Sequence, residues 1–213
     1  RSMKKDIFFL VSHELYWPER YQAAQEILGS DIKVIVNNGS ILEGFKSAND
    51  CASTDLFVLI DGDNYLYPIA REEIFQTAEP TLFCTRNKYN ISYGHGGIKI
   101  IRRATNWNFK FYSDVTAKLN LKMSNKVLSF HDFGFSSKNE WITIFKEVVK
   151  LYLRGSEATL SAWLKFPLPQ KILNFSLQYI QSCDLSSLQQ SLISRPLQED
   201  LYEKYCYQYN LQK

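Results

Sequence analysis

The sequence, 213 residues long, lacks several features that would each identify a class of protein. No apolar run approaches the roughly 18 residues needed to span a membrane, and the first residues show neither the charged nor the apolar region of a signal peptide. The chain has only 4 Cys, widely spaced and without a C-x-x-C pair, and only 3 His. These features exclude a zinc knuckle and a multi-histidine metal site, and they favour reduced thiols. We therefore expect a cytoplasmic protein without a membrane span.

The composition is that of an ordinary globular protein, but its charge is unevenly distributed. Hydrophobic residues make up 45% and charged residues 22%, which suits one medium-sized domain, alone or with an appended helical segment. The net charge is +3, but residues 1–85 are acidic, with 7 Lys/Arg against 13 Asp/Glu. Residues 86–154 are basic, with 13 Lys/Arg against 4 Asp/Glu. Such a basic block is either a solvated face or a surface for a polyanion, either a nucleotide diphosphate or a nucleic acid.

The most informative stretch runs from residue 55 to residue 65. Residues 56–60 are all apolar and rich in β-branched and aromatic side chains, which predicts a strand buried on both faces. Asp61-Gly62-Asp63 follows, and the alternation of an extended chain would turn both carboxylates the same way. Two carboxylates at the end of a strand suit Mg²⁺ or Mn²⁺, which leave coordination positions for substrate phosphates. The alternative interpretation is a simple turn, for which Asp, Gly and Asn are equally typical.

Strands and helices alternate through the first part of the chain. Besides the strand at 56–60, apolar runs predict strands at 6–12, 31–36 and 81–85, and apolar spacing with capping signals predicts helices at 19–28 and 41–52. Strand–helix repeats with short links predict an α/β fold with a doubly wound, mostly parallel sheet flanked by helices.

This order of elements, ending in D-x-D, resembles the nucleotide-binding half of a GT-A glycosyltransferase. The segment Tyr93-Gly94-His95-Gly96-Gly97-Ile98-Lys99, followed by an Arg pair, resembles family-2-like members and, more closely, small GT-A-type proteins encoded by tailed phages. Its glycines would let the backbone approach a ligand, although a tight hairpin also explains them. The resemblance implies a GT-A-like, Rossmann-type sheet and, for a phage-encoded protein, work in the host cytoplasm.

The same resemblance implies a donor site, a metal site and an acceptor site. GT-A enzymes commonly take a third metal ligand from a histidine well after the D-x-D motif, and His131 stands where it is expected. Asp132 beside it would act as catalytic base or orient the imidazole, and Glu140 is a second candidate base. The expected positions are Asp61, Asp63 and His131 for the metal; Asp63 and Asp132 for catalysis; Val11, Ser12, His13, Asn38, Asp61, Gly62, Asp63, Gly96, Gly97 and Lys99 for the nucleotide sugar; and Arg86, Tyr93 and His95 for the acceptor.

From Lys138 onward the pattern is helical. Apolar residues at i, i+3, i+4 spacing predict core packing for one stripe, made up of Trp141, Ile144, Phe145, Val148, Val149 and Tyr152. Residues 170–213 predict short amphipathic helices. We expect a catalytic domain over residues 1–154 and a helical extension over residues 155–213, which packs on it and either covers the acceptor side or mediates dimerisation.

Together these features predict a metal-dependent glycosyltransferase, a hexosyl- or pentosyltransferase that uses Mn²⁺ or Mg²⁺ and a nucleotide-diphosphate sugar, with UDP-sugar favoured. The basic block, with Trp107, Phe109, Phe111 and Tyr112 among its Lys and Arg residues, favours a hydroxylated base in phage DNA as acceptor, which implies DNA modification. A surface glycan, a lipid carrier or a protein hydroxyl are alternative acceptors. A nucleotidyltransferase with the same D-x-D metal site and a non-catalytic binding module are alternative functions.

Overall fold

The structure is a computed structural model, which describes residues 4–12, 14, 16–87, 92–109, 115, 118–132, 136–153 and 169–211. The chain divides into two compact units, residues 1–132 and residues 133–213. The first unit is an α/β sandwich and the second is helical. The predicted fold class is therefore confirmed.

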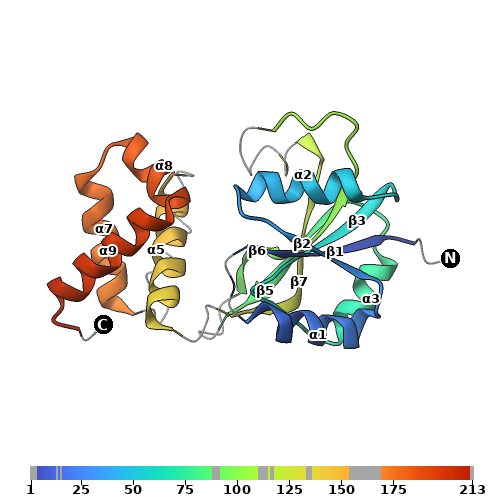
Figure 1. Cartoon of the computed structure of the whole chain (residues 1–213), viewed down its shortest axis with the longest axis horizontal. Helices are drawn as coiled ribbons and strands as arrows, with labels where there is room; N and C mark the ends of the chain where they lie inside the picture. Colours follow the sequence, from blue (N-terminus) through green and yellow to red (C-terminus); the bar gives the residue numbers. More distant parts are fainter. Residues whose placement is uncertain are drawn as a thin grey trace. The chain divides into compact units, whose positions relative to one another are not determined.

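In the described part of the first unit, the strands form a 7-stranded sheet in the order β2-β1-β3-β6-β5-β7-β4. Its strands are β1 (Asp6–Val11), β2 (Ile32–Val36), β3 (Leu56–Asp61), β4 (Asn64–Leu66), β5 (Thr81–Arg86), β6 (Ser92–Arg102) and β7 (Lys122–His131). Its helices are α1 (Trp17–Leu28), α2 (Ile41–Cys51) and α3 (Ile69–Gln76). Figure 1 shows α2 over one face of the sheet and α1 and α3 over the other.

The sheet is mixed, whereas a mostly parallel one was expected. β1 pairs in parallel with β2 and β3, and β5 pairs in parallel with β7. β6 runs antiparallel to both β3 and β5, and β4 runs antiparallel to β7. The sequence between β5 and β6 is too short for the crossover that parallel neighbours need, so these two strands pair as a hairpin.

Strand β3 is buried on both faces, as its unbroken apolar run predicts. Leu56, Val58 and Ile60 pack in the core beneath α1 and α3, whereas Phe57 and Leu59 pack in the core beneath α2. All five side chains are at most 5% exposed. Because side chains pack against β3 on both faces, the residue at its carboxyl end, Asp61, is held at a defined position.

The second unit consists of α5 (Ser137–Leu153), α7 (Gln170–Ser182), α8 (Leu185–Ile193) and α9 (Arg195–Gln208) among its described residues. Trp141 of α5 lies at the centre of an aromatic cluster, with ring centroids 5.0 to 5.6 Å from those of Phe145, Phe175, Tyr202 and Tyr205. The predicted core stripe is confirmed except at its last member. Tyr152 is 50% exposed.

Helix α5 packs with the C-terminal helices, so the boundary between compact units falls after Asp132, earlier than the expected boundary after residue 154. The stripe around Trp141 explains the difference, because its apolar side chains are buried against α7, α8 and α9. None of the described helices combines the length and apolar character needed to cross a membrane.

Asp6, at the start of β1, holds the loop before β3. Its carboxylate accepts hydrogen bonds from the backbone amides of Ser53 and Thr54, at 2.6 and 3.0 Å, and pairs with Lys33 at 3.1 Å. Burial alone would raise the pKa of Asp6, but the hydrogen bonds from Ser53, Lys33 and Thr54 hold it well below its usual range. The carboxylate therefore stabilises the fold above the pKa of about 3.9 that it has in an unfolded chain.

We expect Asp6→Asn to lower the free energy of unfolding by about 1–3 kcal/mol at pH 7, because the amide cannot accept all the hydrogen bonds that the carboxylate accepts. Urea unfolding at pH 7 and at pH 3 measures this. The difference from wild type should shrink as pH falls below about 4, because the unfolded chain then gains a proton on Asp6 while the folded carboxylate stays ionised. Asp50→Asn, in an exposed ion pair with Lys46, is the matched control and should change stability by less than about 0.5 kcal/mol. An equal loss in both variants would contradict the prediction.

Candidate active site at the carboxyl ends of beta3 and beta7

The D-x-D motif lies at the carboxyl end of β3, where the chain turns sharply into β4. Asp61 is the last residue of β3, and Gly62 and Asp63 form a turn before Asn64 begins β4. The amide of Gly62 donates to the carbonyl of Leu10 at 2.8 Å, and a Cβ on Gly62 would stand 2.8 Å from the same oxygen. The motif is thus both a turn and the end of a buried strand, and only glycine fits against β1 at its centre.

Because of this turn, the two carboxylates contact different partners, although an extended chain would have turned them the same way. Asp61 accepts from Lys99 Nζ of β6 at 2.6 Å. Asp63 Oδ2 lies 2.8 Å from His131 Nε2 at the end of β7. The pairing of β4 with β7 brings the second contact about, since Asn64 lies opposite His131 and the amide of Asp132 donates to the carbonyl of Asp63 at 2.8 Å.

Lys99 is a buried cation, only 1% exposed, whose ammonium lies 5.2 Å from the centroid of the Phe45 ring. Burial raises the pKa of the Asp61 carboxyl, the Lys99 charge opposes this, and the Asp63 charge adds to it. Asp61 Oδ1 is itself buried without a hydrogen-bond partner. One carboxylate oxygen at the end of β3 therefore lacks a hydrogen-bond partner within the described fold.

Asp63 is held ionised. Burial would raise its pKa, but the charge and hydrogen bond of His131, with the charges of Lys99 and Arg20, lower it to about 2. Asn64 Nδ2 also donates to Asp63 Oδ1 at 2.6 Å. These partners fix the carboxylate in place.

Glu14, in the loop after β1, is a site residue that sequence reasoning missed. Its Oε2 accepts from the amide of Ser12 at 2.6 Å and would stand 3.4 Å from a Cβ on Gly62. Burial first, and then the charges of Asp63 and Asp61, raise its pKa to about 7. Glu14, Asp61 and Asp63 therefore interact electrostatically at one edge of the sheet, and the titration of Glu14 falls near neutral pH. Nothing in its local sequence marks it, because its burial depends on the turn at Gly62.

Arg20 of α1 is a second missed residue. It is 2% exposed, pairs with the Asp132 carboxylate, and lies with its guanidinium carbon 5.5 Å from the centroid of the Tyr65 ring. Arg20 occupies the buried face of α1 together with Ala24 and Leu28. That four-residue spacing is the signal that could have revealed it, because a charge on an apolar helix stripe needs a buried partner.

Gly97 makes room for a buried polar cluster beneath the motif. A Cβ on Gly97 would stand 2.3 Å from Asn64 Oδ1 and 2.7 Å from Ser129 Oγ. Those two groups hydrogen-bond to each other and to Thr85 Oγ1, each at 3.0 Å. In contrast, a Cβ on Gly96 would meet nothing within 4 Å. Gly97 therefore supports Asn64, which in turn contacts Asp63, and Gly96 borders open space.

Most of the other expected site residues lie around the same edge of the sheet, and the exceptions are His13 and Glu140. Val11 and Ser12 follow one another at the end of β1, and Asn38 is exposed just before α2. Arg86 is exposed at the end of β5, which runs parallel to β7. Tyr93 and His95 lie on β6 opposite Thr85 and Cys84, and His13 lies outside the described residues. Glu140 belongs to α5 in the second unit.

The donor chemistry of this edge fits a hard divalent cation, although internal contacts now occupy much of it. Among the described residues, no three His, Cys, Asp or Glu side chains gather as a metal site. Asp61 contacts Lys99, and Asp63 contacts His131. The buried Asp61 oxygen and the mutual repulsion of Glu14, Asp61 and Asp63 would both be relieved by a cation. Carboxylate oxygens are the ligands that Mg²⁺ and Mn²⁺ prefer.

Comparison with known proteins adds only distant likenesses. No protein-family model and no curated protein matches the chain. Among solved structures it is similar to HddC from Yersinia pseudotuberculosis, at 14% identity over 58% of this chain and 71% of that chain, with a TM-score of 0.36. It is also similar to a glycosyltransferase involved in the glycosylation of the major capsid of PBCV-1 (13%, 63% and 98%, TM-score 0.39) and to the inositol-1-phosphate CTP transferase from T. maritima (13%, 61% and 70%, TM-score 0.38). Scores this low carry no argument about function.

We expect Gly97→Ala to destabilise the protein by about 1–3 kcal/mol, because the added methyl overlaps Asn64 and Ser129 in a packed interior. Gly96→Ala adds the same methyl to the neighbouring position, where it meets nothing, and is the matched control. Chemical denaturation of both variants provides the comparison. Equal stabilities of the two variants would contradict the prediction, because they would show that Asn64 and Ser129 move aside without a cost in free energy.

Glu14 should make stability depend on pH in an unusual direction. Its folded pKa of about 7 lies above the ordinary value of 4.5, so the folded state holds the proton more tightly than the unfolded state. The protonated Glu14 carboxyl therefore contributes to the free energy of unfolding below pH 4.5. This contribution, at most about 3 kcal/mol, is lost as pH rises from 4.5 through 7. Glu14→Gln should remove that fall, which urea midpoints at pH 5 and pH 8 would measure. An unchanged pH dependence in the variant would contradict this assignment.

Proposed function

We propose that this chain is a glycosyltransferase that transfers a sugar from a nucleotide-diphosphate sugar to an acceptor hydroxyl, with Mn²⁺ or Mg²⁺ held by Asp61 and Asp63. The observation that carries the proposal is the convergence of ionisable side chains at one sheet edge. The D-x-D carboxylates, Glu14 and Asp132 lie there with two buried cations, Lys99 and Arg20. Ligands of open α/β sheets bind at the carboxyl ends of the strands, which is this edge.

The architecture agrees with what the sequence resemblance implies. In a GT-A glycosyltransferase the nucleotide-binding half ends in the D-x-D motif. Here β1, β2 and β3 pair in parallel and the motif follows β3 directly. Val11, Ser12 and Asn38, at the ends of β1 and β2, are accordingly the proposed positions for the base and ribose, with the donor expected to be a UDP-sugar.

The diphosphate is expected at the motif and not at the start of α2. Helix N-termini often bind phosphates through free amides. In α2, however, Ser40 and Glu43 form a capping box, with the Ser40 side chain accepting from the Glu43 amide at 3.3 Å. That helix end is already satisfied, so Lys99 and the cation site are the better positions for negative charge.

A divalent cation at Asp61 and Asp63 would neutralise charge that develops on the departing nucleoside diphosphate. Lys99 holds a second positive charge beside Asp61, in a site where burial strengthens it. His131, in contact with Asp63, is proposed to orient that carboxylate or to serve as a further ligand. These residues assist departure of the leaving group whichever stereochemistry the enzyme follows.

Two carboxyl groups are candidates for the base that an inverting enzyme needs. Asp132 is held by Arg20, which fixes its position beside Asp63. Glu14 has a pKa of about 7, and a base that titrates near the working pH accepts and returns a proton most efficiently. A retaining enzyme would need neither group.

The proposed acceptor is a hydroxylated base in DNA, supported by the basic block of residues 86–154 and by the resemblance to phage-encoded proteins. Such a base would have to leave the stack for its hydroxyl to reach the sugar. A surface glycan is the alternative acceptor. The proposal makes the chain a DNA-modifying enzyme of phage type, working in the host cytoplasm.

A nucleotidyltransferase with the same metal site is the second candidate function. Such an enzyme would normally have a glycine-rich phosphate loop after its first strand. In this chain Ser12-His13-Glu14 occupies that position, and the Glu14 carboxylate lies against the motif. This observation favours the glycosyltransferase. Release of pyrophosphate, and not of a nucleoside diphosphate, would identify the rival.

Thermal-shift measurements with nucleoside diphosphates and nucleotide sugars, each with and without Mn²⁺, test the proposal. We expect a metal-dependent rise in Tm for one diphosphate, equivalent to about 2.7 kcal/mol at a ligand concentration of 100 Kd. Asp63→Asn should abolish this rise, because the amide loses the charge that the cation needs. Glu79→Gln, at the opposite edge of the sheet, should keep it. No metal-dependent shift in the wild-type protein, or an equal shift in Asp63→Asn, would refute the metal site.

A further inference from the structure

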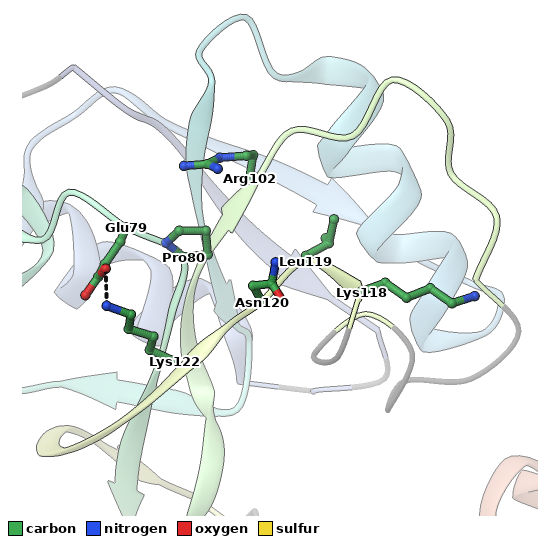
Figure 2. A pocket seen from close by; sticks show the side chains of 7 residues that line it. All are labelled: Glu79, Pro80, Arg102, Lys118, Leu119, Asn120 and Lys122. Carbon is green, nitrogen blue, oxygen red and sulfur yellow. Dashed lines mark ion pairs between the residues drawn. The ribbon is translucent and has the colours of Figure 1, made fainter.

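A basic hollow lies at the edge of the sheet opposite the D-x-D motif. It has a volume of about 290 Å³ and is lined by Glu79, Pro80, Arg102, Lys118, Leu119, Asn120 and Lys122 (Figure 2). Where β6 runs alongside β3, Arg102 lies opposite Leu56, which is the first residue of β3, whereas Asp61 is the last residue of that strand. At about 3.3 Å per residue, roughly 17 Å of strand separates the two edges.

The hollow is built by strand ends, so its position in the fold is fixed. β5 and β7 begin side by side, with Thr81 opposite Lys122, and the Lys122 amide donates to the carbonyl of Pro80 at 2.9 Å. β6 ends here at Arg102. Leu119 packs against the core beneath α2. The pocket is therefore not a product of one surface loop.

Positive charge predominates in the lining, with three basic residues against one carboxylate. Lys122 Nζ lies 2.5 Å from Glu79 Oε2, and Arg102 Nε lies 3.7 Å from Asp55 Oδ2. Arg102 and Lys122 are 55% and 66% exposed, so these ion pairs are weak and an incoming anion can replace them. Lys118 differs, because its ammonium lies 5.8 Å from the Phe109 ring centroid and extends away from Arg102 and Lys122 in Figure 2.

Size and chemistry together point to one phosphate group as the occupant. The volume is at the lower limit of the roughly 300–1,000 Å³ of small-molecule sites, so the hollow suits a phosphate group together with the sugar attached to it. The Arg guanidinium matches phosphate oxygens in pairs, and Lys adds a point charge. Pro80 and Leu119 add apolar surface to the lining, which suits the sugar beside a phosphodiester.

The charge beyond the hollow indicates a chain of phosphates. Arg103, next to Arg102, is also exposed, and its amide donates to the Asp55 carbonyl at 2.8 Å. In the described residues 102–109 and 118–122, Arg102, Arg103, Lys118 and Lys122 are basic and no residue is acidic. Closely spaced cations of this kind bind a phosphodiester backbone by releasing its counterions.

We propose that this hollow binds the phosphodiester backbone of a nucleic-acid strand through Arg102 and Lys122, as a site separate from the D-x-D edge. The interaction needs neither nucleotide sugar nor metal, so it does not rest on the proposed transferase activity. Trp107 and Phe109 are not required as stacking platforms, because each packs partly buried against the core and their ring centroids lie 4.6 Å apart. Recognition through the backbone alone predicts little sequence preference.

Binding of a fluorescent single-stranded oligonucleotide to the full chain, followed by anisotropy across a salt series, tests this proposal. Arg102→Ala/Lys122→Ala should weaken binding and reduce the slope of log K against log salt by about 1.4, the value for two lost phosphate contacts on a single strand. Lys126→Ala is the matched control. Lys126 also lies on β7, is 60% exposed and pairs with Glu73 at 2.6 Å, and its loss should leave affinity and slope unchanged.

Competition distinguishes the sources of phosphate. Polyphosphate chains and unlabelled DNA should displace the probe, whereas a nucleoside monophosphate or inorganic phosphate at the same phosphate concentration should displace it far less. Equal affinities of Arg102→Ala/Lys122→Ala and Lys126→Ala for the probe would overturn the proposal. Displacement by inorganic phosphate as effective as that by DNA would also overturn it and would mark the hollow as a site for small anions. A Mn²⁺-dependent Tm shift with a nucleoside diphosphate, measured in the same double variant, reports the D-x-D edge separately.

Discussion

The arrangement of the candidate site depends on the junction between the turn after β3 and the end of β7. The Asp132 amide donates to the Asp63 carbonyl, and the His131 imidazole lies against the Asp63 carboxylate. This junction places His131 and Asp132 beside a motif 68 residues earlier in the chain. Without it, Asp63 would stand in an exposed turn, and the histidine would have no defined relation to the motif.

Charge at this edge is balanced within the fold. Asp61 is paired with Lys99, Asp132 with Arg20, and Asp63 with His131. Burying charges is unfavourable unless each finds a partner, so such a cluster costs stability unless the geometry is good. Glu14 has no cationic partner among these residues, and burial first, then the charges of Asp63 and Asp61, raise its pKa. A fold that retains an unfavourable excess of carboxylates is consistent with a site that gains a cation in use.

Much of the first unit could be predicted from local patterns, and the site only in part. The buried run of β3 and the capping signals of α2 are local, and both predictions were confirmed. Strand β4 could not be predicted, because three residues after Asp-Gly-Asp resemble the rest of a turn until they pair with β7. The direction of β6 was not predicted, because the glycines at 94–97 were interpreted as a ligand-binding segment or a tight hairpin, whereas the structure places them within a strand.

The missed site residues share one property, which is that their roles come from distant contacts. Arg20 meets a partner 112 positions away, and the pKa of Glu14 depends on charges at Asp63 and Asp61. Gly97 was expected to bind a nucleotide sugar through its backbone, a role that stays a prediction, but the structure gives it a packing role beside Asn64 and Ser129. Helix α5 was assigned to the first domain because nothing in its own stripe says which unit it will pack with.

Strand β3 also sets a fixed distance across the first unit. It separates the carboxylate edge from the basic hollow by about 17 Å, and its buried interior prevents that separation from varying. Successive base pairs of a DNA duplex are about 3.4 Å apart along its axis. A duplex held at Arg102 and Lys122 and running along the unit would therefore present to the D-x-D edge a position about five base pairs from the held phosphate. The fold would then select a nucleotide by its distance from the held phosphate along the nucleic acid, and not by the base sequence around it.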